Sequence, residues 1–398
     1  DEGELVYTER DYALIRSGEG KYYRLFKDDS RKKLSFHDDG FGGINLLEFG
    51  NYKLKIIAYD YNQNEISISG NLIIEENKIN SKTAKIGSEI QLFKNNCENC
   101  EIHQFEHGIY FSIPQSSIKG TPEVFINSNI IQNKEVEFHY FKNDNNHEFV
   151  FNPTHLESIN CINFKSQTNN LEFPFNGTYS VPNRPVKIRQ DNIIVEGNGD
   201  TFYDTSFVWI RKLETKPELN YGKLLEGPWE VGPDFIPYRN QIEIEITTSQ
   251  FDIKDSEQIS IYYLNEKNQA WYYMPTTFSK KTNSFKTSAL SGEIFALIKE
   301  DNPPEINRFS PKLGKKLSST KSYNLSFKIK DDLSGIDGEN NVEIRINNNK
   351  IIHEYNSYRK EINYPLNGEL KSGENHVEII AKDRAGNETK IEGKWILE

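Results

Sequence analysis

Cysteine and methionine are scarce in this sequence of 398 residues, which holds three Cys and one Met. So few cysteines are expected either of a reduced compartment or of a large exported protein that does not rely on disulfides, and the count does not decide between them. Long apolar runs are missing as well. Because a membrane-spanning helix needs about 18 or more consecutive apolar residues, the sequence predicts no transmembrane segment.

Positive charge is outnumbered, since 48 Lys and Arg residues stand against 59 Asp and Glu residues and the formal net charge is -11. A chain of this charge has no general attraction to phosphate backbones, so we expect no nucleic-acid partner. Catalytic groupings are also missing: no Ser-His-Asp or Cys-His pattern rises above chance, and the glycine-rich residues 197–200 are typical of a turn rather than of a phosphate-binding loop. The sequence therefore predicts no enzyme activity for this chain.

Alternation of apolar and polar residues is what the sequence does contain. Leu325, Phe327 and Ile329 alternate with polar residues, and so do Ile242, Ile244 and Ile246. A period of two predicts half-buried β-strands, and the loops rich in Asp and Asn between them suit turns. We therefore predict an all-β protein made of tandem immunoglobulin-like β-sandwich modules in an elongated array.

Linker signals divide the chain into four predicted modules. The two prolines in residues 301–304 break any preceding strand, and the polar residues 75–82 are typical of a linker. The last module has the size of an immunoglobulin-like sandwich but lacks the Cys and core Trp of an antibody domain. The predicted modules are an incomplete immunoglobulin-like sandwich at 1–76, β-modules at 77–182 and 183–300, and an immunoglobulin-like sandwich at 301–398.

Residues 50–60 match residues 373–383 position for position in residue type, and both stretches continue to an Asn-Glu pair. We interpret this match as a repeated module. Too few residues precede Gly50 to complete the first copy of the module. We therefore expect that its missing part lies in a further segment upstream. The start at Asp1 rather than Met fits removal of an export signal and trimming of the chain equally well.

The order of features over residues 186–299 resembles the ZU5-like β-modules of bacterial surface proteins. It comprises a Gly-Pro entry at Gly227, an Ile-x-Ile-x-Ile strand, a Tyr-Tyr pair, a Trp-Tyr-Tyr-Met stretch and a closing Phe-Ala-Leu-Ile. The terminal module, with its Asp-Asp-x-Ser-Gly-Ile-Asp loop at 331–337 and its Ala-x-Asp-Arg-Ala-Gly-Asn ending at 381–387, resembles immunoglobulin-like domains at the C-terminus of certain bacterial M23-family (LytM-type) cell-wall metallopeptidases.

The M23 resemblance implies a fold and a setting but no catalytic residue. Such peptidases hold zinc through H-x3-D and H-x-H motifs, and none of the eight His residues begins either pattern. The expected function is a non-catalytic accessory region of an exported bacterial cell-envelope protein, periplasmic, on the cell surface or secreted, that spaces or targets an upstream M23-type peptidase. The alternatives are an independent surface adhesion or glycan-binding protein and an enzyme with an unrecognised site.

Aromatic clusters supply candidate glycan-binding residues. Neighbours on a strand face opposite ways, so one member of each aromatic group should point outward, as sugar-stacking platforms do. The candidates are Tyr263, Trp271 and Tyr273. Core filling with an ordinary exposed Tyr is the simpler account of the same residues.

Acidic loop residues supply a candidate calcium site. Calcium takes six to eight oxygen ligands, and the terminal sandwich could gather several of them at one end. Turn capping by Asp and Asn explains the same residues without an ion, and we favour it, so we expect no cofactor. The candidate ligands are Asp331, Asp332, Asp337 and Asp383.

Three further groups of residues could suggest a metal or catalytic site, but each has a simpler structural interpretation. His103 and His107 would share a helix face, but their surroundings look extended. Glu243 and Glu245 are expected on the solvated face of a strand. A loop disulfide or thiols are favoured over a metal for the cysteines, which are Cys97, Cys100 and Cys161.

Overall fold

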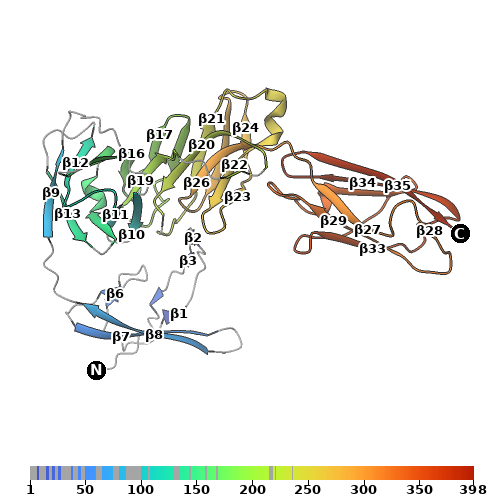
Figure 1. The fold of residues 1–398 in the computed structure, drawn as a ribbon, viewed down its shortest axis with the longest axis horizontal. Coiled ribbons are helices and arrows are strands. Elements are labelled where there is room, and N and C mark those ends of the chain that lie inside the picture. The colour runs from blue at the N-terminus through green and yellow to red at the C-terminus, as the bar shows by residue number, and fades with distance from the viewer. Residues whose placement is uncertain are drawn as a thin grey trace. The chain divides into compact units, whose positions relative to one another are not determined.

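The computed structural model describes strand segments between residues 7 and 86, residues 100–234 with short gaps, and all of residues 236–398 (Figure 1). The chain divides into two compact units, one of Asp1–Phe173 with Phe235–Tyr238 and one of Pro174–Asp234 with Arg239–Glu398. The helical elements of the described residues are three 3-10 turns, and the rest of the regular structure is β-strand, so the predicted all-β class is confirmed. These turns are η1 (Pro153–His155), η2 (Ile253–Gln258) and η3 (Glu339–Asn341).

Within the described residues, no helix has the length and apolar character needed to cross a membrane.

The N-terminal part of the first unit contains four two-stranded antiparallel sheets. Three of them are short pairs, whereas the fourth has ten residues in each strand. The pairs are β1 (Tyr7–Thr8) with β4 (Phe26–Lys27), β2 (Ile15–Ser17) with β3 (Gly20–Tyr22), β5 (His37–Asp38) with β6 (Ile44–Asn45), and β7 (Gly50–Tyr59) with β8 (Glu65–Ile74).

The β7–β8 hairpin has the same dimensions as the last hairpin of the chain, β34 (Gly373–Lys382) with β35 (Glu388–Leu397). In both hairpins the strands have ten residues, and five residues connect them. The first residue of each leading strand pairs with the last residue of its partner, Gly50 with Ile74 and Gly373 with Leu397. The repeat predicted from residue types is confirmed in this hairpin.

The remaining strands of the first unit follow the order β10-β11-β14-β13-β9-β12-β15. Its core is rich in Phe, and the rings of Phe111 and Phe151 meet edge to face with centroids 5.6 Å apart. The strands are β9 (Asn80–Ile86), β10 (Glu101–Phe105), β11 (Gly108–Pro114), β12 (Glu123–Ser128), β13 (Glu135–Lys142), β14 (Asn146–Phe151) and β15 (Ile159–Lys165).

The second unit begins with two layers of strands that pack through β17 against β19 and through β22 against β25. One layer runs β19-β20-β26-β22-β23 beside the end of β16, and the other runs β17-β18-β21-β25-β24. The strands are β16 (Asn170–Ser180), β17 (Val186–Gln190), β18 (Ile193–Gly197), β19 (Ser206–Lys212), β20 (Lys223–Gly232), β21 (Ile242–Thr247), β22 (Ile259–Asn265), β23 (Ala270–Tyr273), β24 (Thr277–Ser279), β25 (Ser284–Ala289) and β26 (Ile294–Lys299).

Trp209 on β19 is one of two fully buried tryptophans of the first layer, the other being Trp229 on β20. Trp209 pairs across the sheet with Gly177 on β16 and with Gly232 on β20. A Cβ atom at Gly232 would overlap the indole ring of Trp209, and one at Gly177 would overlap the ring of Phe207. The two glycines therefore leave the space that the aromatic rings of β19 occupy.

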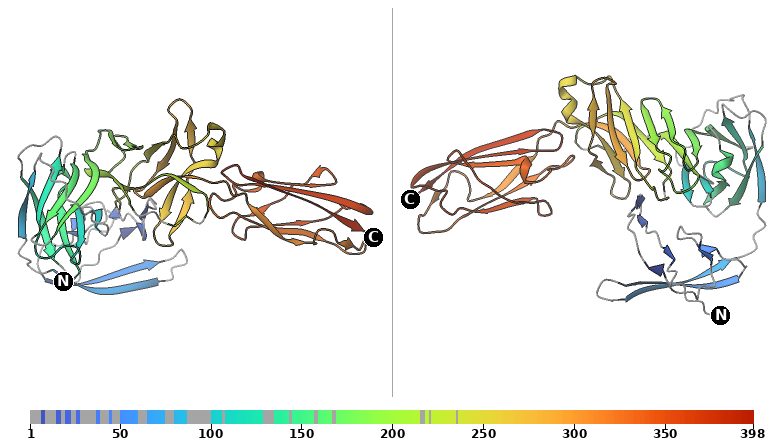
Figure 2. Two further views of the ribbon diagram at one scale, coloured as in Figure 1. Left: turned by 45° about the horizontal axis from the view of Figure 1, so that its top comes forward. Right: turned by 180° about the vertical axis from the view of Figure 1, so that it is seen from behind.

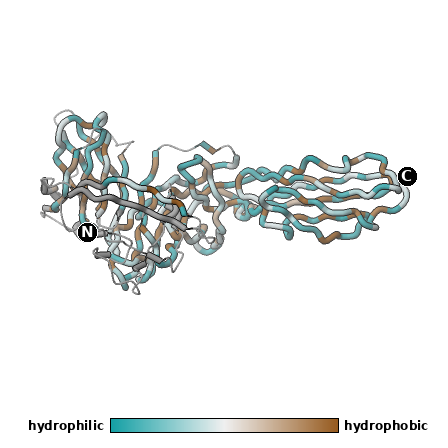
Figure 3. The backbone as a smooth tube through the Cα atoms, turned by 90° about the horizontal axis from the view of Figure 1, so that it is seen from below, coloured by the Kyte–Doolittle hydropathy of each residue, from teal (hydrophilic) through white to brown (hydrophobic). Residues whose placement is uncertain are grey.

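The C-terminal sandwich has a sheet of order β27-β29-β33-β32 and a sheet of order β28-β35-β34-β30-β31 (Figure 1, Figure 2). Apolar and polar residues alternate along its strands, as Figure 3 shows in brown and teal, so that each sheet turns one face to a shared core. The strands other than β34 and β35 are β27 (Glu305–Ser310), β28 (Lys316–Leu317), β29 (Asn324–Lys330), β30 (Val342–Ile346), β31 (Asn349–Lys350), β32 (Tyr355–Asn356) and β33 (Glu361–Pro365).

This core contains a tryptophan, so the expectation of a module without one is wrong. Trp395 on β35 is fully buried, and its Nε1–H donates to the carbonyl oxygen of Pro311 at 3.3 Å. The residue stands near the end of the chain, where β35 pairs with both β34 and β28 and is therefore an inner strand of its sheet.

The predicted module boundaries at 76, 182 and 300 fall between strands, after β8, after β16 and after β26. Strand β16 itself contains the boundary between the two compact units. The four-module division stays a prediction.

We predict that Gly232→Ala lowers the free energy of unfolding of the second unit by about 1–3 kcal/mol, because the added methyl group must displace the Trp209 ring from a packed core. The control is Gly70→Ala in β8 of the first unit, where nothing lies within 4 Å of the added atom, and it should leave the fluorescence transition unchanged because all four Trp residues lie in the second unit. Urea denaturation followed by Trp fluorescence measures both variants. Equal stability of Gly232→Ala and wild type would contradict the close packing.

Candidate functional site

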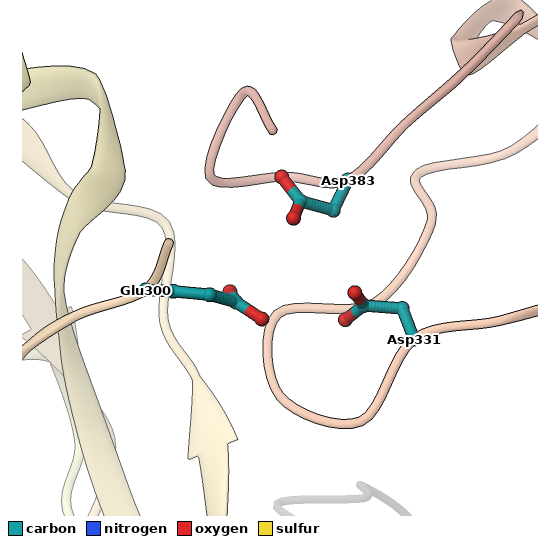
Figure 4. Close-up of side chains that lie close together, drawn as sticks. All are labelled: Glu300, Asp331 and Asp383. Carbon is teal, nitrogen blue, oxygen red and sulfur yellow. The ribbon is translucent and has the colours of Figure 1, made fainter. Parts of the chain in front are cut away.

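Three carboxylates come together inside the second unit, where the first pair of layers meets the C-terminal sandwich (Figure 4). They belong to Glu300, which directly follows β26, to Asp331, which follows β29, and to Asp383, which follows β34. One ligand atom from each lies within 4.8 Å of the other two. Glu300 is 1% exposed and Asp383 is 2% exposed, so two of the three charges are removed from water.

Hydrogen bonds from β22 and from the loop after β29 position Glu300. Its Oε2 atom accepts from the Tyr262 hydroxyl at 3.2 Å and from the backbone N–H of Ser334 at 3.2 Å. Its own backbone N–H donates to the carbonyl oxygen of Gln258 at 2.8 Å. A single carboxylate thus connects the two sandwiches of this unit.

The two aspartates close their own loops. Asp331 Oδ2 accepts from the backbone N–H groups of Leu333 at 3.2 Å and Gly335 at 2.5 Å. Asp383 accepts from the backbone N–H and the side-chain amide of Asn387, both at 2.8 Å. The interpretation of these two aspartates as turn-capping residues is confirmed.

The Asn387 side chain continues this network across the junction. Its Nδ2 atom donates to the carbonyl oxygen of Glu300 at 3.2 Å, and its Oδ1 atom accepts from Gln258 Nε2 at 2.7 Å. Thr389 Oγ1 adds a bond of 2.5 Å to the carbonyl oxygen of Pro304 in the linker. Side chains of the C-terminal hairpin therefore satisfy backbone groups at the end of the preceding sandwich.

Burial and mutual repulsion change the acidity of the cluster. The pKa of Glu300 is raised to about 7, chiefly by burial and also by the negative charges of Asp331 and Asp383, while the hydrogen bonds from Ser334 and Tyr262 oppose the rise. Burial also raises the pKa of Asp331 and of Asp383. At neutral pH the Glu300 carboxyl therefore holds a proton in a large fraction of molecules.

The structure brings together only two of the four aspartates predicted as calcium ligands. Asp332 instead forms an ion pair with Lys330 at 2.7 Å, and Asp337 forms one with Arg384 at 3.0 Å. Among the described residues, Glu300, Asp331 and Asp383 are the group whose ligand atoms come close enough for a cation, but N–H donors already engage each carboxylate. The hydrogen bonds explain the cluster without an ion.

Sequence reasoning missed Glu300. The available signal was its position. Glu300 follows β26, in which all residues but Lys299 are buried, and it comes just before the Pro-Pro linker, so an acidic side chain there must face whatever follows the linker. To predict Glu300 as part of the site, one would also have to know that the loops after β29 and β34 lie at the same end of the next sandwich.

The aromatic candidates divide between two faces. Tyr263 and Tyr272 stack on the outer face with ring centroids 5.4 Å apart, so one member of each aromatic group does point outward. The prediction that Trp271 is such a member is wrong, because Trp271 is 8% exposed and packs in the core with Leu264, its cross-strand partner. Tyr273 is half-buried and lies 5.8 Å from the Arg384 guanidinium.

The remaining candidates are structural. His103 lies in β10, as the extended pattern predicts, and its Nε2 atom is 3.5 Å from Glu101, whereas His107 lies outside the described residues. Glu243 and Glu245 share the polar face of β21 and both pair with Lys286, but the expectation of a solvated face holds only for Glu243, because its side chain is 46% exposed and that of Glu245 is 13% exposed. Among the cysteines, Cys100 is disulfide-bonded, Cys161 is a buried thiol and Cys97 lies outside the described residues.

No family model and no curated protein matches the sequence. Among solved structures, a tetra-tandem repeat from the extending region of a large adhesion protein aligns at 12% identity over 88% of this chain and 82% of its own, with a TM-score of 0.21. A Ca2+-stabilized adhesin that helps an Antarctic bacterium reach out and bind ice aligns at 8% identity over 88% and 82%, with a TM-score of 0.18.

The extracellular domain of a hybrid two component system from B. thetaiotaomicron aligns at 10% identity over 94% of this chain and 64% of its own, with a TM-score of 0.22. These TM-scores are too low to establish a shared fold with any of the three proteins. The fold assignment therefore rests on the strands and their pairing.

We predict that raising the pH from about 4.5 to about 7 weakens the second unit through Glu300. The folded state holds this proton up to about pH 7, whereas the unfolded chain releases it near the ordinary value of 4.5. The folded state therefore binds more protons in this window, and its free energy of unfolding falls as pH rises, by at most about 1.4 kcal/mol per pH unit for one group. Urea denaturation across the window should show the slope reduced in Glu300→Gln.

The control for this pH series is Glu354→Gln, which removes an exposed carboxyl of the C-terminal sandwich and should keep the wild-type slope. Comparing variant with wild type also isolates Glu300 from His353, whose burial lowers its pKa and makes a contribution of the opposite sign. Parallel slopes for Glu300→Gln and wild type would contradict the assignment.

We predict little or no effect of calcium on the melting temperature, because N–H donors already engage the three carboxylates. A cation that bound only the folded state at a hundredfold excess over its Kd would add about 2.7 kcal/mol. Thermal melting of the whole chain in calcium and in chelator tests this. A calcium-dependent rise that disappears in Asp383→Asn would show that the cluster is a cation site.

Proposed function

We propose that this chain is a non-catalytic accessory region of an exported bacterial cell-envelope protein, which spaces an upstream M23-type peptidase and positions it against the wall. The peptidase partnership comes from the resemblance of the terminal module. The observation that supports the positioning role is the hydrogen-bonded junction inside the second unit, where Glu300 and Asn387 join the two sandwiches.

A spacer works by keeping its modules at a fixed angle. The linker between β26 and β27 holds five residues, 300–304, and its polar groups are engaged at both ends, by Asn387 at Glu300 and by Thr389 at Pro304. A flexible linker exposes its backbone to water and leaves domains free to move. The buried contacts at this junction favour a fixed arrangement of the two sandwiches instead.

The non-catalytic part of the proposal rests on the sequence, which contains neither H-x3-D nor H-x-H. Location outside the cytoplasm follows from the same resemblance, and it is consistent with the low cysteine count.

The proposal predicts that loosening the junction lowers wall hydrolysis by the full-length protein without changing its chemistry. Asn387→Ala removes the bond to Glu300, and it should reduce digestion of intact cell walls severalfold while leaving cleavage of a short soluble peptide unchanged. The control is Asn340→Ala, an exposed Asn of the same sandwich, which should behave as wild type in both assays.

Two results would contradict separate parts of the proposal. A full-length gene without an H-x3-D and H-x-H domain would remove the peptidase partnership. Equal digestion of intact walls by Asn387→Ala and wild type would remove the positioning role.

A further inference from the structure

A groove of about 590 Å³ lies beside the carboxylate cluster in the second unit. Its walls come from η2, β22 and the β23–β24 segment on one side, and from the loops after β29 and β34 on the other. The volume lies within the range of about 300–1,000 Å³ that is usual for small-molecule sites, which often form where domains meet.

The two walls differ in chemistry. Tyr273 and Phe278 supply half-buried aromatic rings on the first wall, and the Arg384 guanidinium of the second wall lies over the Tyr273 ring, 5.8 Å from its centroid. Asp337, Asn341 and Arg384 supply planar polar groups on the second wall. A ligand in this groove would meet flat apolar surface on one side and hydrogen-bonding groups on the other.

The charged groups of the groove favour a neutral ligand that donates hydrogen bonds. Both cations are already paired, Lys382 with Glu388 at 3.1 Å and Arg384 with Asp337 at 3.0 Å. The carboxylate of Glu257 adds a further acceptor, because it lies against the loop after β34, 3.7 Å from where a Cβ of Gly386 would be. An anionic ligand would meet these carboxylates without an unpaired cation to balance them.

We propose that this groove binds a neutral oligosaccharide of two or three sugar units. Sugar rings have an apolar face of C–H groups that stacks on aromatic rings and an edge of hydroxyls that donate to carboxylate and amide oxygens. The Tyr273 and Phe278 wall takes the first role, and Asp337, Asn341 and Glu257 take the second. The proposal goes beyond the spacer role and does not depend on it.

The adjacent tyrosines of β23 provide a matched pair for the test. Tyr273 lines the groove, whereas Tyr272 stacks on Tyr263 on the opposite face of the strand and is 40% exposed. Tyr273→Ala therefore removes the stacking surface, and Tyr272→Ala removes a similar ring from outside the groove.

Isothermal titration calorimetry of the whole chain with three neutral trisaccharides tests the proposal. They are the trimers of N-acetylglucosamine, of β-linked glucose and of α-linked, maltose-type glucose. We expect at least one of them to bind, Tyr273→Ala to bind it at least about tenfold more weakly, and Tyr272→Ala to bind it as wild type. Asn341→Ala, at the end of η3 and outside the apolar core, should also weaken binding, and it tests the groove without a change in core packing. Thermal melting confirms that each variant is folded.

Three outcomes would overturn the proposal. The first is no heat of binding with any trimer at about 10 mM, a concentration that detects a Kd in the millimolar range. The second is equal loss of affinity in Tyr272→Ala and Tyr273→Ala. The third comes from a parallel titration with a cationic glucosamine trimer: binding of that trimer alone, lost at high salt, would assign the groove to amines rather than to neutral sugars.

Discussion

The second unit depends on hydrogen bonds to the carboxylates buried where its two sandwiches meet, because Glu300 and Asp383 are almost completely shielded from solvent and find their partners in the protein. Glu300 receives hydrogen bonds from both sandwiches, through Tyr262 on one side and Ser334 on the other. An unpaired buried carboxylate would cost several kcal/mol or take up a proton, and the raised pKa of Glu300 shows that the second response operates in part. The loops after β29 and β34 adopt the conformations that satisfy this group.

Most of the fold could be predicted from the sequence because a half-buried strand shows a local alternation of apolar and polar residues. The period of two at Ile242, Ile244 and Ile246 needs no knowledge of the partner sheet, and all three residues are buried in β21. The repeat at Gly50 and Gly373 was equally readable, since residue types that fix a hairpin also fix its register.

The site could be predicted only in part, because it depends on contacts between distant residues. The sequence marks Asp331 and Asp383 as loop residues, but their meeting with Glu300 is set by the packing of one sandwich on the other. The prediction for Trp271 failed because alternation shows only that neighbouring side chains face opposite sides of the sheet. Which of them faces inward depends on the pairing between strands, and Trp271 pairs with buried Leu264. Trp395 was missed because an inner strand at the end of a chain resembles an edge strand in sequence.

Asn387 has two structural roles that are normally separate. It closes the β34–β35 hairpin through Asp383, and it satisfies the backbone of Glu300 in the neighbouring sandwich. Unfolding the C-terminal sandwich would therefore leave buried polar groups of its neighbour without partners, and the free energies of unfolding of the two are not independent. The two sandwiches should therefore unfold in one cooperative transition, as a single thermodynamic domain rather than as two independent ones.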